Sequence, residues 1–120
     1  MEKKLVGRFG EHTAAEYLKK KRYKIVGLNY SCRFGEIDVI AENKKYIVFV
    51  EVKLRKSNSF AEAREFVTQS KQEKIIKTAS LWLSLNETGL QPRFDVIEIY
   101  APEGAESKAV KINHIENAFQ

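Results

Sequence analysis

The chain has 120 residues, a mass of 13.8 kDa and 43% hydrophobic residues, which is enough for one packed domain and excludes a disordered chain. Its 21 basic and 16 acidic residues give a net charge of +5. The basic excess lies in the first half, because residues 1–56 hold 14 basic and 7 acidic side chains whereas residues 57–120 hold 7 and 9. A basic half indicates a polyanionic partner such as a nucleic acid.

The single cysteine, Cys32, excludes an intramolecular disulfide and a zinc site built from a cysteine cluster. A lone thiol is typical of a reducing compartment. Charge interrupts the first residues before a signal-peptide apolar region could form, and the longest apolar run, residues 46–50, is too short to cross a bilayer. We therefore expect one cytoplasmic domain over residues 1–120, without a membrane partner.

The first half of the chain predicts one helix followed by three strands. Residues 3–22 carry apolar side chains at helical spacing and end in four basic residues, which the helix dipole favours at a C-terminus. Aromatic and β-branched residues then predict strands, and polar segments predict the turns between them. The expected bounds are a strand over residues 23–30, a turn over 31–35, a strand over 35–41, a hairpin loop over 42–45 and a strand over 46–55.

The second half predicts a long helix and two further strands. The helix begins at Thr68 or Ser70 and ends near Asn86, and Ser70 and Glu73 have the spacing of a capping box. The other expected segments are a loop over residues 56–59, an ambiguous segment over 60–67, a strand over 93–100, a loop over 102–107 and a strand over 109–115. The order α-β-β-β-α-β-β is that of a mixed α+β domain.

Glu51 stands out in the third predicted strand. The strand starts with five apolar residues, which is typical of a central strand, and period-2 alternation then puts Phe49, Glu51 and Lys53 on one face. A carboxylate at the end of a core strand must be paired, bound to a metal or protonated to offset its desolvation. The alternative is an ordinary ion pair in solvent, worth about 0–1 kcal/mol.

Asp38 is expected beside Glu51. If residues 42–45 close the hairpin, the numbers of opposed residues sum to 87, so that Asp38 faces Phe49 and lies diagonally from Glu51, with Cα atoms roughly 7–8 Å apart. A sum of 89 would place the two carboxylates directly opposite, and an even sum would put them on different faces. Two carboxylates and Lys53 on one face suit Mg²⁺ and the hydrolysis of a phosphate ester.

Glu11 is a third candidate carboxylate. At about 100° per residue it falls on the same side of the first helix as Ala14 and Ala15. Gly7 and Gly10 each cost about 1 kcal/mol in a helix interior, which is understandable if the helix approaches the sheet closely. Glu11 would then lie near the strands. The alternative is a rim residue beside small side chains.

These residues resemble the YraN-like family, a largely uncharacterised bacterial group assigned to the restriction-endonuclease-like (PD-(D/E)xK) nuclease superfamily. The resemblance covers nearly the whole chain, and its most specific blocks are Gly-Glu-Ile-Asp at residues 35–38 and Phe-Val-Glu-Val-Lys at residues 49–53. Weaker matches are residues 7–11, Ala14 or Ala15, Asn29, Arg55, Lys71 and residues 93–95.

The resemblance implies a restriction-endonuclease-like core, α-β-β-β-α-β, with a mixed sheet flanked by helices in three layers. It implies that Asp38 and Glu51 are metal ligands, that Val52 offers its backbone carbonyl to the metal, and that Lys53 is the catalytic lysine. Glu11 resembles the acidic residue on the first helix of archaeal Holliday-junction resolvases. Gln69 or Gln72, with Lys71, corresponds to a polar residue that some members place on the second helix.

Basic side chains are expected to form a phosphate-binding surface around this site. Such contacts give salt-dependent, sequence-neutral affinity. The alternative for residues 19–22 is a solvated helix end. The candidate residues are Lys19, Lys20, Lys21, Arg22, Arg33, Arg55, Lys56 and Lys71, and Lys74 and Lys77 continue a basic row along the second helix.

The leading hypothesis is therefore a Mg²⁺- or Mn²⁺-dependent endonuclease that hydrolyses phosphodiester bonds in DNA, branched or single-stranded DNA included. The first alternative is a nucleic-acid-binding or adaptor module on a nuclease fold without physiological cleavage. The second is an interaction domain whose charges serve solubility only. Because the related resolvases act as dimers, a homodimer is the assembly that the resemblance implies.

Overall fold

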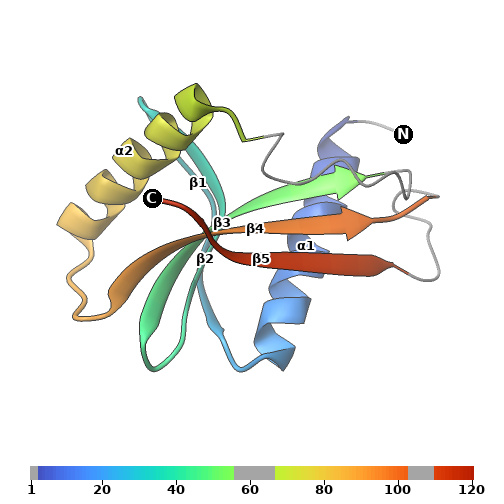
Figure 1. The fold of residues 1–120 in the computed structure, drawn as a ribbon, viewed down its shortest axis with the longest axis horizontal. Helices are drawn as coiled ribbons and strands as arrows, with labels where there is room; N and C mark the ends of the chain where they lie inside the picture. The colour runs from blue at the N-terminus through green and yellow to red at the C-terminus, as the bar shows by residue number, and fades with distance from the viewer. Residues whose placement is uncertain (1–2, 56–66, 103–109) are drawn as a thin grey trace.

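The computed structural model describes residues 3–55, 67–102 and 110–120, with the side chains of the helix start described from residue 8 onward. The predicted order of elements is confirmed (Figure 1). The expected loop over residues 56–59, most of the ambiguous segment and most of the loop over 102–107 lie outside the described residues. The elements are α1 Lys3–Lys20, β1 Lys24–Cys32, β2 Gly35–Glu42, β3 Tyr46–Arg55, α2 Gln69–Leu85, β4 Gln91–Tyr100 and β5 Lys111–Phe119.

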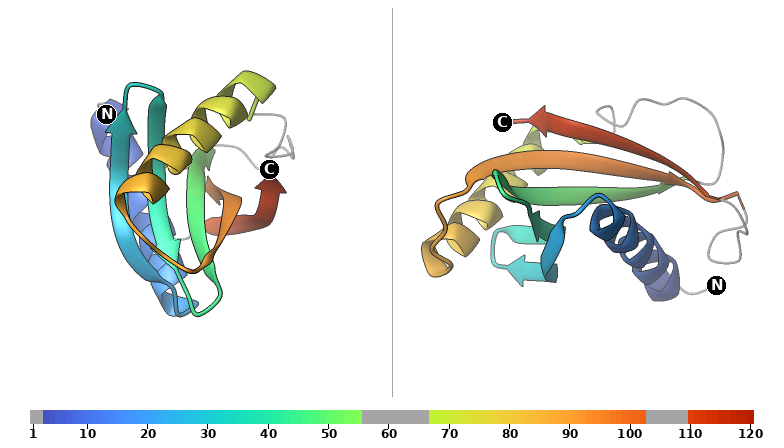
Figure 2. Two further views of the ribbon diagram at one scale, coloured as in Figure 1. Left: turned by 90° about the vertical axis from the view of Figure 1, so that its left-hand side faces the viewer. Right: turned by 90° about the horizontal axis from the view of Figure 1, so that it is seen from below.

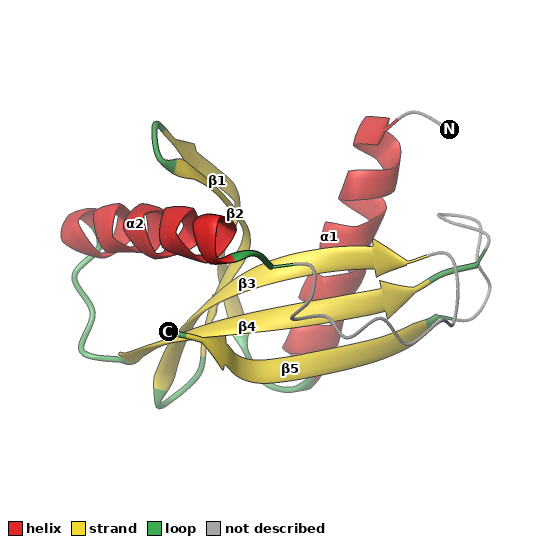
Figure 3. Cartoon of the chain, turned by 45° about the horizontal axis from the view of Figure 1, so that its top comes forward, coloured by secondary structure: helices red, strands yellow, loops and turns green. Residues whose placement is uncertain are grey.

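The five strands form one mixed sheet in the order β1-β2-β3-β4-β5. The pairs β1–β2, β2–β3 and β4–β5 are antiparallel, whereas β3 and β4 run parallel. Parallel neighbours need a crossover connection, and α2 lies in it. Figure 3 shows the β1–β2 hairpin twisting away from β3, β4 and β5 at its turn end. The α+β fold class predicted from the sequence is confirmed.

The two helices cover opposite faces of the sheet (Figure 2). Alternation along β3 sends Val48 and Val50 into a core with α1, and Ile47 and Phe49 into a second core with α2. Both faces of the central strand are therefore buried, as its apolar run predicted. Among the described residues, no helix is long and apolar enough to cross a membrane.

Helix α1 packs against the end of β3. A Cβ added at Gly10 would meet Val52 Cγ1 at 3.5 Å and Leu54 Cβ at 3.9 Å, which are ordinary van der Waals distances, so α1 packs directly against β3 at this residue. The expected close approach of the first helix is confirmed at Gly10. It brings Glu11, the next residue, to the same end of β3.

The expected register of the β2–β3 hairpin is wrong by two residues. The opposed pairs, Ile40 with Phe49 and Glu42 with Ile47 among them, sum to 89 rather than 87. The cause is a tighter loop of residues 43–45, in which Asn43 Oδ1 accepts hydrogen bonds from the N–H groups of Lys45 (2.9 Å) and Tyr46 (2.7 Å). Glu42 therefore stays in the strand. The two-residue shift keeps the parity on which the predicted carboxylate pair depends.

Several predicted boundaries also need correction. β1 continues through Cys32, so the expected turn over residues 31–35 shrinks to Arg33 and Phe34. β5 continues to Phe119, beyond the expected end at residue 115. The N-cap of α2 is Thr68, whose Oγ1 accepts a hydrogen bond from the Lys71 N–H at 3.1 Å, so the capping box from Ser70 is wrong and the alternative start at Thr68 is right.

A buried network of ion pairs and hydrogen bonds links β4 to α1 and β5. Asp95, fully buried, accepts hydrogen bonds from Arg93 Nε and one terminal guanidinium nitrogen, both at 2.8 Å, and from the Asn117 N–H at 3.0 Å. His114 Nε2 lies 2.7 Å from the same carboxylate, and its Nδ1 lies 3.1 Å from the Tyr17 hydroxyl of α1. Asp95 therefore connects α1, β4 and β5.

The network keeps Asp95 ionised. Burial alone would raise the pKa of this carboxyl group, but the hydrogen bonds from His114, Arg93 and the Asn117 N–H outweigh it and lower the pKa below its ordinary value of 3.8. Arg93 also donates to the Tyr23 hydroxyl at 2.7 Å. The sequence singled out residues 93–95 only by resemblance and assigned them no structural role, which the network now supplies.

Candidate active site

The predicted carboxylates meet where β2 and β3 separate. The paired residues run from Glu42–Ile47 to Val39–Val50, and the next residue, Asp38, reaches across to β3 with its side chain. Asp38 Oδ2 accepts a hydrogen bond of 2.8 Å from the Val52 N–H. The register places Asp38 opposite Glu51, as the alternative sum of 89 required. The Val52 N–H, which lies beyond the last β2–β3 pair, therefore holds the Asp38 carboxylate beside Glu51.

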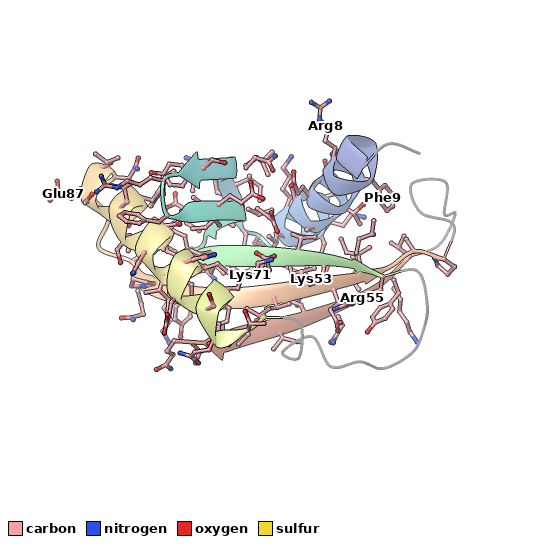
Figure 4. All side chains as sticks on the ribbon, turned by 90° about the horizontal axis from the view of Figure 1, so that it is seen from above. Arg8, Phe9, Lys53, Arg55, Lys71 and Glu87 are labelled. Carbon is pink, nitrogen blue, oxygen red and sulfur yellow. The ribbon has the colours of Figure 1, made fainter. Side chains whose placement is uncertain are left out.

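Glu51 is buried and shared by two lysines. Its side chain is 8% exposed, and its Oε1 lies 2.6 Å from Lys71 Nζ and 3.6 Å from Lys53 Nζ. Figure 4 shows Lys71, from α2, and Lys53, from β3, next to each other over the same strand. The alternative for Glu51, an ion pair in solvent with Lys53 or Arg55, is right about Lys53 as a partner. It is wrong about the solvent, because the carboxylate is buried and also pairs with Lys71 of α2.

Asp38 is the residue whose protonation the site changes most. Burial, and next the negative charge of Glu51, raise its pKa from 3.8 to about 7, against the hydrogen bond from the Val52 N–H. Glu11 and Glu36 raise this pKa further. The fold thus places Glu11 of α1 close enough to act on Asp38, as the sequence predicted. Crowded carboxylates in a partly buried position favour a bound cation.

The two lysines respond to the site in opposite directions. The pKa of Lys53 is lowered, first by burial and next by the neighbouring Lys71. For Lys71, burial acts against the charged form, but the hydrogen bond and the charge of Glu51 outweigh it and raise the pKa. Lys71 is thus the firmer cation, and Lys53 is the lysine that gives up its proton more readily.

Two pockets border these residues. One, of about 290 Å³, is lined by Glu51 and Glu36 from the sheet and by the first turns of α2, including Lys71 and Lys74. The other, of about 250 Å³, lies between α1 and β1 and is bordered by Glu11. Its remaining lining residues include Arg8, His12, Lys19, Leu28 and Asn29. A ligand thus has room beside Glu51, whereas the second pocket adjoins Glu11 and includes neither Asp38 nor Glu51.

The donor set fits a cation that keeps much of its water. Within the described parts of the chain, no group of three or more His, Cys, Asp or Glu side chains is arranged to hold a metal by itself. Mg²⁺ is commonly held by one or two carboxylates, with water and substrate phosphate completing its shell, so Asp38 and Glu51 suffice for it. Val52 takes part through its N–H, and its carbonyl as a ligand stays a prediction.

Of the predicted basic surface, Lys71 reaches the site directly. Arg55 lies further along β3 than Lys53 (Figure 4). Its Nε lies 3.4 Å from Glu98 Oε2. Lys19 pairs with Glu16 at 3.6 Å, and Arg33 stacks on Phe34 at the β1–β2 turn, with its guanidinium carbon 4.8 Å from the ring centroid.

The basic end of α1 lies away from Asp38 and Glu51, although Lys19 lines the pocket that Glu11 borders. Residues 19–22 lie at or just beyond the last turn of α1, the helix shown in Figure 1. From the rise of an α-helix, Lys20 is roughly 13 Å along the axis from Glu11. Lys20, Lys21 and Arg22 are exposed there, as a solvated helix end would be. Lys56 lies outside the described residues. The predicted basic residues therefore do not form one surface around the site. Among those the structure describes, Lys71 is the one that contacts Glu51.

The contact between Lys71 and Glu51 is the feature that sequence reasoning missed. The sequence resemblance names Gln69 or Gln72, with Lys71, for the polar position on α2, but it does not predict a contact with Glu51. Gln72 Nε2 donates to the Val67 carbonyl at 2.9 Å and Gln69 is exposed. A signal was present, because a buried Glu51 needs a cationic partner and Lys71 belongs to the first turn of the next helix. The sequence did not show where α2 crosses the sheet, and that position decides which residue of the helix contacts Glu51.

The comparisons identify relatives along almost the full chain. A family model described as "Uncharacterised protein family UPF0102" matches residues 10–99, which include Glu11, Asp38, Glu51 and Lys53. A UPF0102 protein of Caldanaerobacter subterraneus subsp. tengcongensis is 51% identical over 119 residues, covering 98% of this chain and 96% of the relative. UPF0102 proteins of Caldicellulosiruptor bescii (45% over 121 residues, 99% and 100% covered) and Alkaliphilus oremlandii (46% over 119 residues, 97% and 98% covered) are similar to it as well.

Proposed function

The chain belongs to the uncharacterised protein family UPF0102, which is the YraN-like family of the sequence resemblance, and we propose that it is a divalent-metal-dependent nuclease that hydrolyses phosphodiester bonds in DNA. The observation that carries this proposal is the pair of carboxylates at the opening between β2 and β3, with Lys53 beside it. Membership of the restriction-endonuclease-like superfamily is part of the same proposal.

Asp38 and Glu51 would hold the cation, Mg²⁺ or Mn²⁺. When bound, it would lower the pKa of a water molecule and neutralise charge that develops on the phosphate. The Val52 N–H holds Asp38 in place for this role, because the 2.8 Å hydrogen bond fixes the carboxylate before any ligand arrives. Preorganisation of this kind removes part of the cost of assembling the site at each turnover.

Lys53 would act on the water or on the phosphate. Its lowered pKa suits a group that orients or helps to deprotonate a water molecule, and its charged form stabilises a phosphate that gains negative charge. Glu11, on α1, adds a third negative charge near Asp38 and strengthens the attraction for a cation.

A polyanionic substrate follows from the charges around the carboxylates. The pocket beside Glu51 is lined by Lys71 and Lys74, which provide cationic partners for backbone phosphates. These contacts read no base sequence, so we expect the enzyme to select DNA by its shape, with branched or single-stranded DNA as the first substrates to examine. A homodimer, as in the resolvases, would suit a branched substrate.

The proposal is tested by incubating the full chain with plasmid, four-way-junction and single-stranded DNA in Mg²⁺ or Mn²⁺. We expect cleavage that needs the cation and that falls at least about 100-fold in Asp38→Asn, whose amide oxygen keeps an acceptor for the Val52 N–H. Cleavage that persists in EDTA, or that Asp38→Asn leaves unchanged, would contradict the mechanism.

One observation favours a second candidate function. Lys53 and Lys71 already neutralise Glu51, so the site does not depend on a cation for its charge balance. The chain would then be a nucleic-acid-binding or adaptor module on a nuclease fold. Salt-sensitive binding of DNA together with no uptake of Mn²⁺ in calorimetry would support this alternative over the nuclease.

A further inference from the structure

Glu51 carries two ammonium groups on one carboxylate oxygen. Lys71 Nζ lies 2.6 Å from Oε1 and Lys53 Nζ lies 3.6 Å from the same atom. One cation would be enough to neutralise one carboxylate, and two lysines this close repel each other. The second lysine therefore needs an explanation beyond charge balance at Glu51.

Lys71 is the lysine that can leave. Its side chain is 42% exposed, compared with 21% for Lys53 and 8% for Glu51. Its backbone is held, because the Lys71 N–H donates to Thr68 Oγ1 at the start of α2. A long, half-exposed side chain on a fixed backbone can move between Glu51 and the adjoining pocket, which Lys71 also lines, without any change in the fold.

We propose that Lys71 is a positioning residue that holds the place of the divalent cation on Glu51 and moves to a DNA phosphate when the cation binds. This inference rests on the proposed function, since it concerns the same carboxylates. It makes Lys71 the physical link between two events, occupation of Asp38 and Glu51 by a cation and arrival of a phosphate beside them.

Two consequences follow from electrostatics. An ammonium group in contact with Glu51 repels a divalent cation bound at either oxygen of that carboxylate, so removing it should raise the affinity for the cation. A phosphate that draws Lys71 away should do the same in the wild type, and reciprocity then requires the cation to strengthen binding of DNA. Lys71 would thus couple the two ligands positively.

The experiment is a calorimetric titration of Mn²⁺ into the full chain and into Lys71→Met, with Asp38→Asn as the variant that lacks a ligand. Lys77→Met is the matched control, because it removes the same charge from an exposed position on the same helix. Each titration is repeated with a phosphorothioate-substituted single-stranded 20-mer, and gels check that the DNA stays intact.

We expect Lys71→Met to bind Mn²⁺ about 10-fold more tightly than the wild type and Lys77→Met to bind as the wild type does. DNA should tighten Mn²⁺ binding in the wild type several-fold and leave Lys71→Met unchanged. Lys71→Gln, a shorter polar variant, should behave as Lys71→Met does. Thermal unfolding of each variant shows that it is folded.

Equal or weaker Mn²⁺ binding by Lys71→Met and Lys71→Gln would overturn the inference. If Asp38→Asn still abolished binding in that case, the proposed metal site would stand, and the two failures are thereby distinguished. Absence of Mn²⁺ binding in the wild type and in Lys71→Met alike would overturn both the inference and the proposed function.

Discussion

Asp38 and Asp95 lie on the same sheet, but their pKa values are shifted in opposite directions. Asp95 is surrounded by donors from Arg93, His114 and the Asn117 N–H, and its pKa is lowered. Asp38 accepts a hydrogen bond from the Val52 N–H, has carboxylates as neighbours, and its pKa is raised to about 7.

The difference shows that burial alone does not identify a functional carboxylate in this fold. Burial acts in the same direction on both residues, toward a higher pKa, and the partners decide the outcome. Asp95 is fully compensated and holds the structure together. Asp38 is placed beside the carboxylates of Glu51, Glu11 and Glu36, which costs stability without a ligand, and under the proposed function a bound cation would remove this cost.

The largest predicted effect is a loss of stability when the charge of Asp95 is removed. Asp95→Asn leaves Arg93 buried without its carboxylate, so we expect a loss of about 3–5 kcal/mol in the free energy of unfolding, measured with urea. Glu116→Gln is the matched control, because Glu116 is exposed and lies 4.0 Å from the same guanidinium group; it should change stability by less than about 0.5 kcal/mol. A loss below about 1 kcal/mol in Asp95→Asn would contradict the structural role.

The next prediction separates holding the cation from using it. Lys53→Met should reduce DNA cleavage about 100-fold while Mn²⁺ binding is retained, because Lys53 acts on water or phosphate and is no ligand. Cleavage rates and calorimetry on the same preparation provide both readouts. If the variant lost Mn²⁺ binding in proportion to its activity, Lys53 would have a different role.

The raised pKa of Asp38 predicts that the stability of the protein changes with pH. The native pKa of Asp38, about 7, lies above its ordinary value of 3.8, so between these values the native state binds more protons than the unfolded state and stability falls as pH rises. Asp38→Asn should therefore stabilise the metal-free protein by about 2 kcal/mol at pH 8, after discounting for solvent screening.

This gain should shrink steadily as the pH is lowered toward 4. Thermal unfolding between pH 4 and pH 8 in EDTA measures it, with Glu87→Gln, at an exposed position beyond the end of α2, as the control. A gain that did not depend on pH would mean that Asp38 is not the group that titrates.

The smallest predicted effect is the loss of stability when the Thr68 side chain, which accepts a hydrogen bond from the Lys71 N–H, is removed. Thr68→Ala removes the N-cap of α2 and should cost about 1 kcal/mol, measured by urea unfolding. Ser70→Ala is the control, since the structure does not use Ser70 as the cap and the change should be close to neutral. Equal losses in the two variants would restore the capping box that the sequence suggested.

Periodicity explains most of what could be predicted. Alternation fixed the faces of β3 and placed Glu51 and Lys53 together, and the parity of the hairpin was enough to bring Asp38 to them. The register itself was wrong because Asn43 closes a tighter loop through its own side chain, and a strand pattern contains no information on that choice.

The unpredicted contacts join segments that are distant in the sequence. Besides Arg93, two positions away, Asp95 has partners 19 and 22 positions away, and Tyr17 contacts His114 across 97 positions. Lys71 reaches Glu51 because α2 crosses the sheet at that point. Such contacts depend on the packing of whole elements, which local pattern does not specify.

The most direct test of the account is a crystal of the full chain soaked with Mn²⁺ and measured for anomalous scattering. The account predicts an anomalous peak bound by Asp38 and Glu51, with Lys71 Nζ displaced from Glu51 Oε1, and no such peak in Asp38→Asn. Saturating Mn²⁺ with no peak at these carboxylates, and Lys71 still in contact with Glu51, would contradict it.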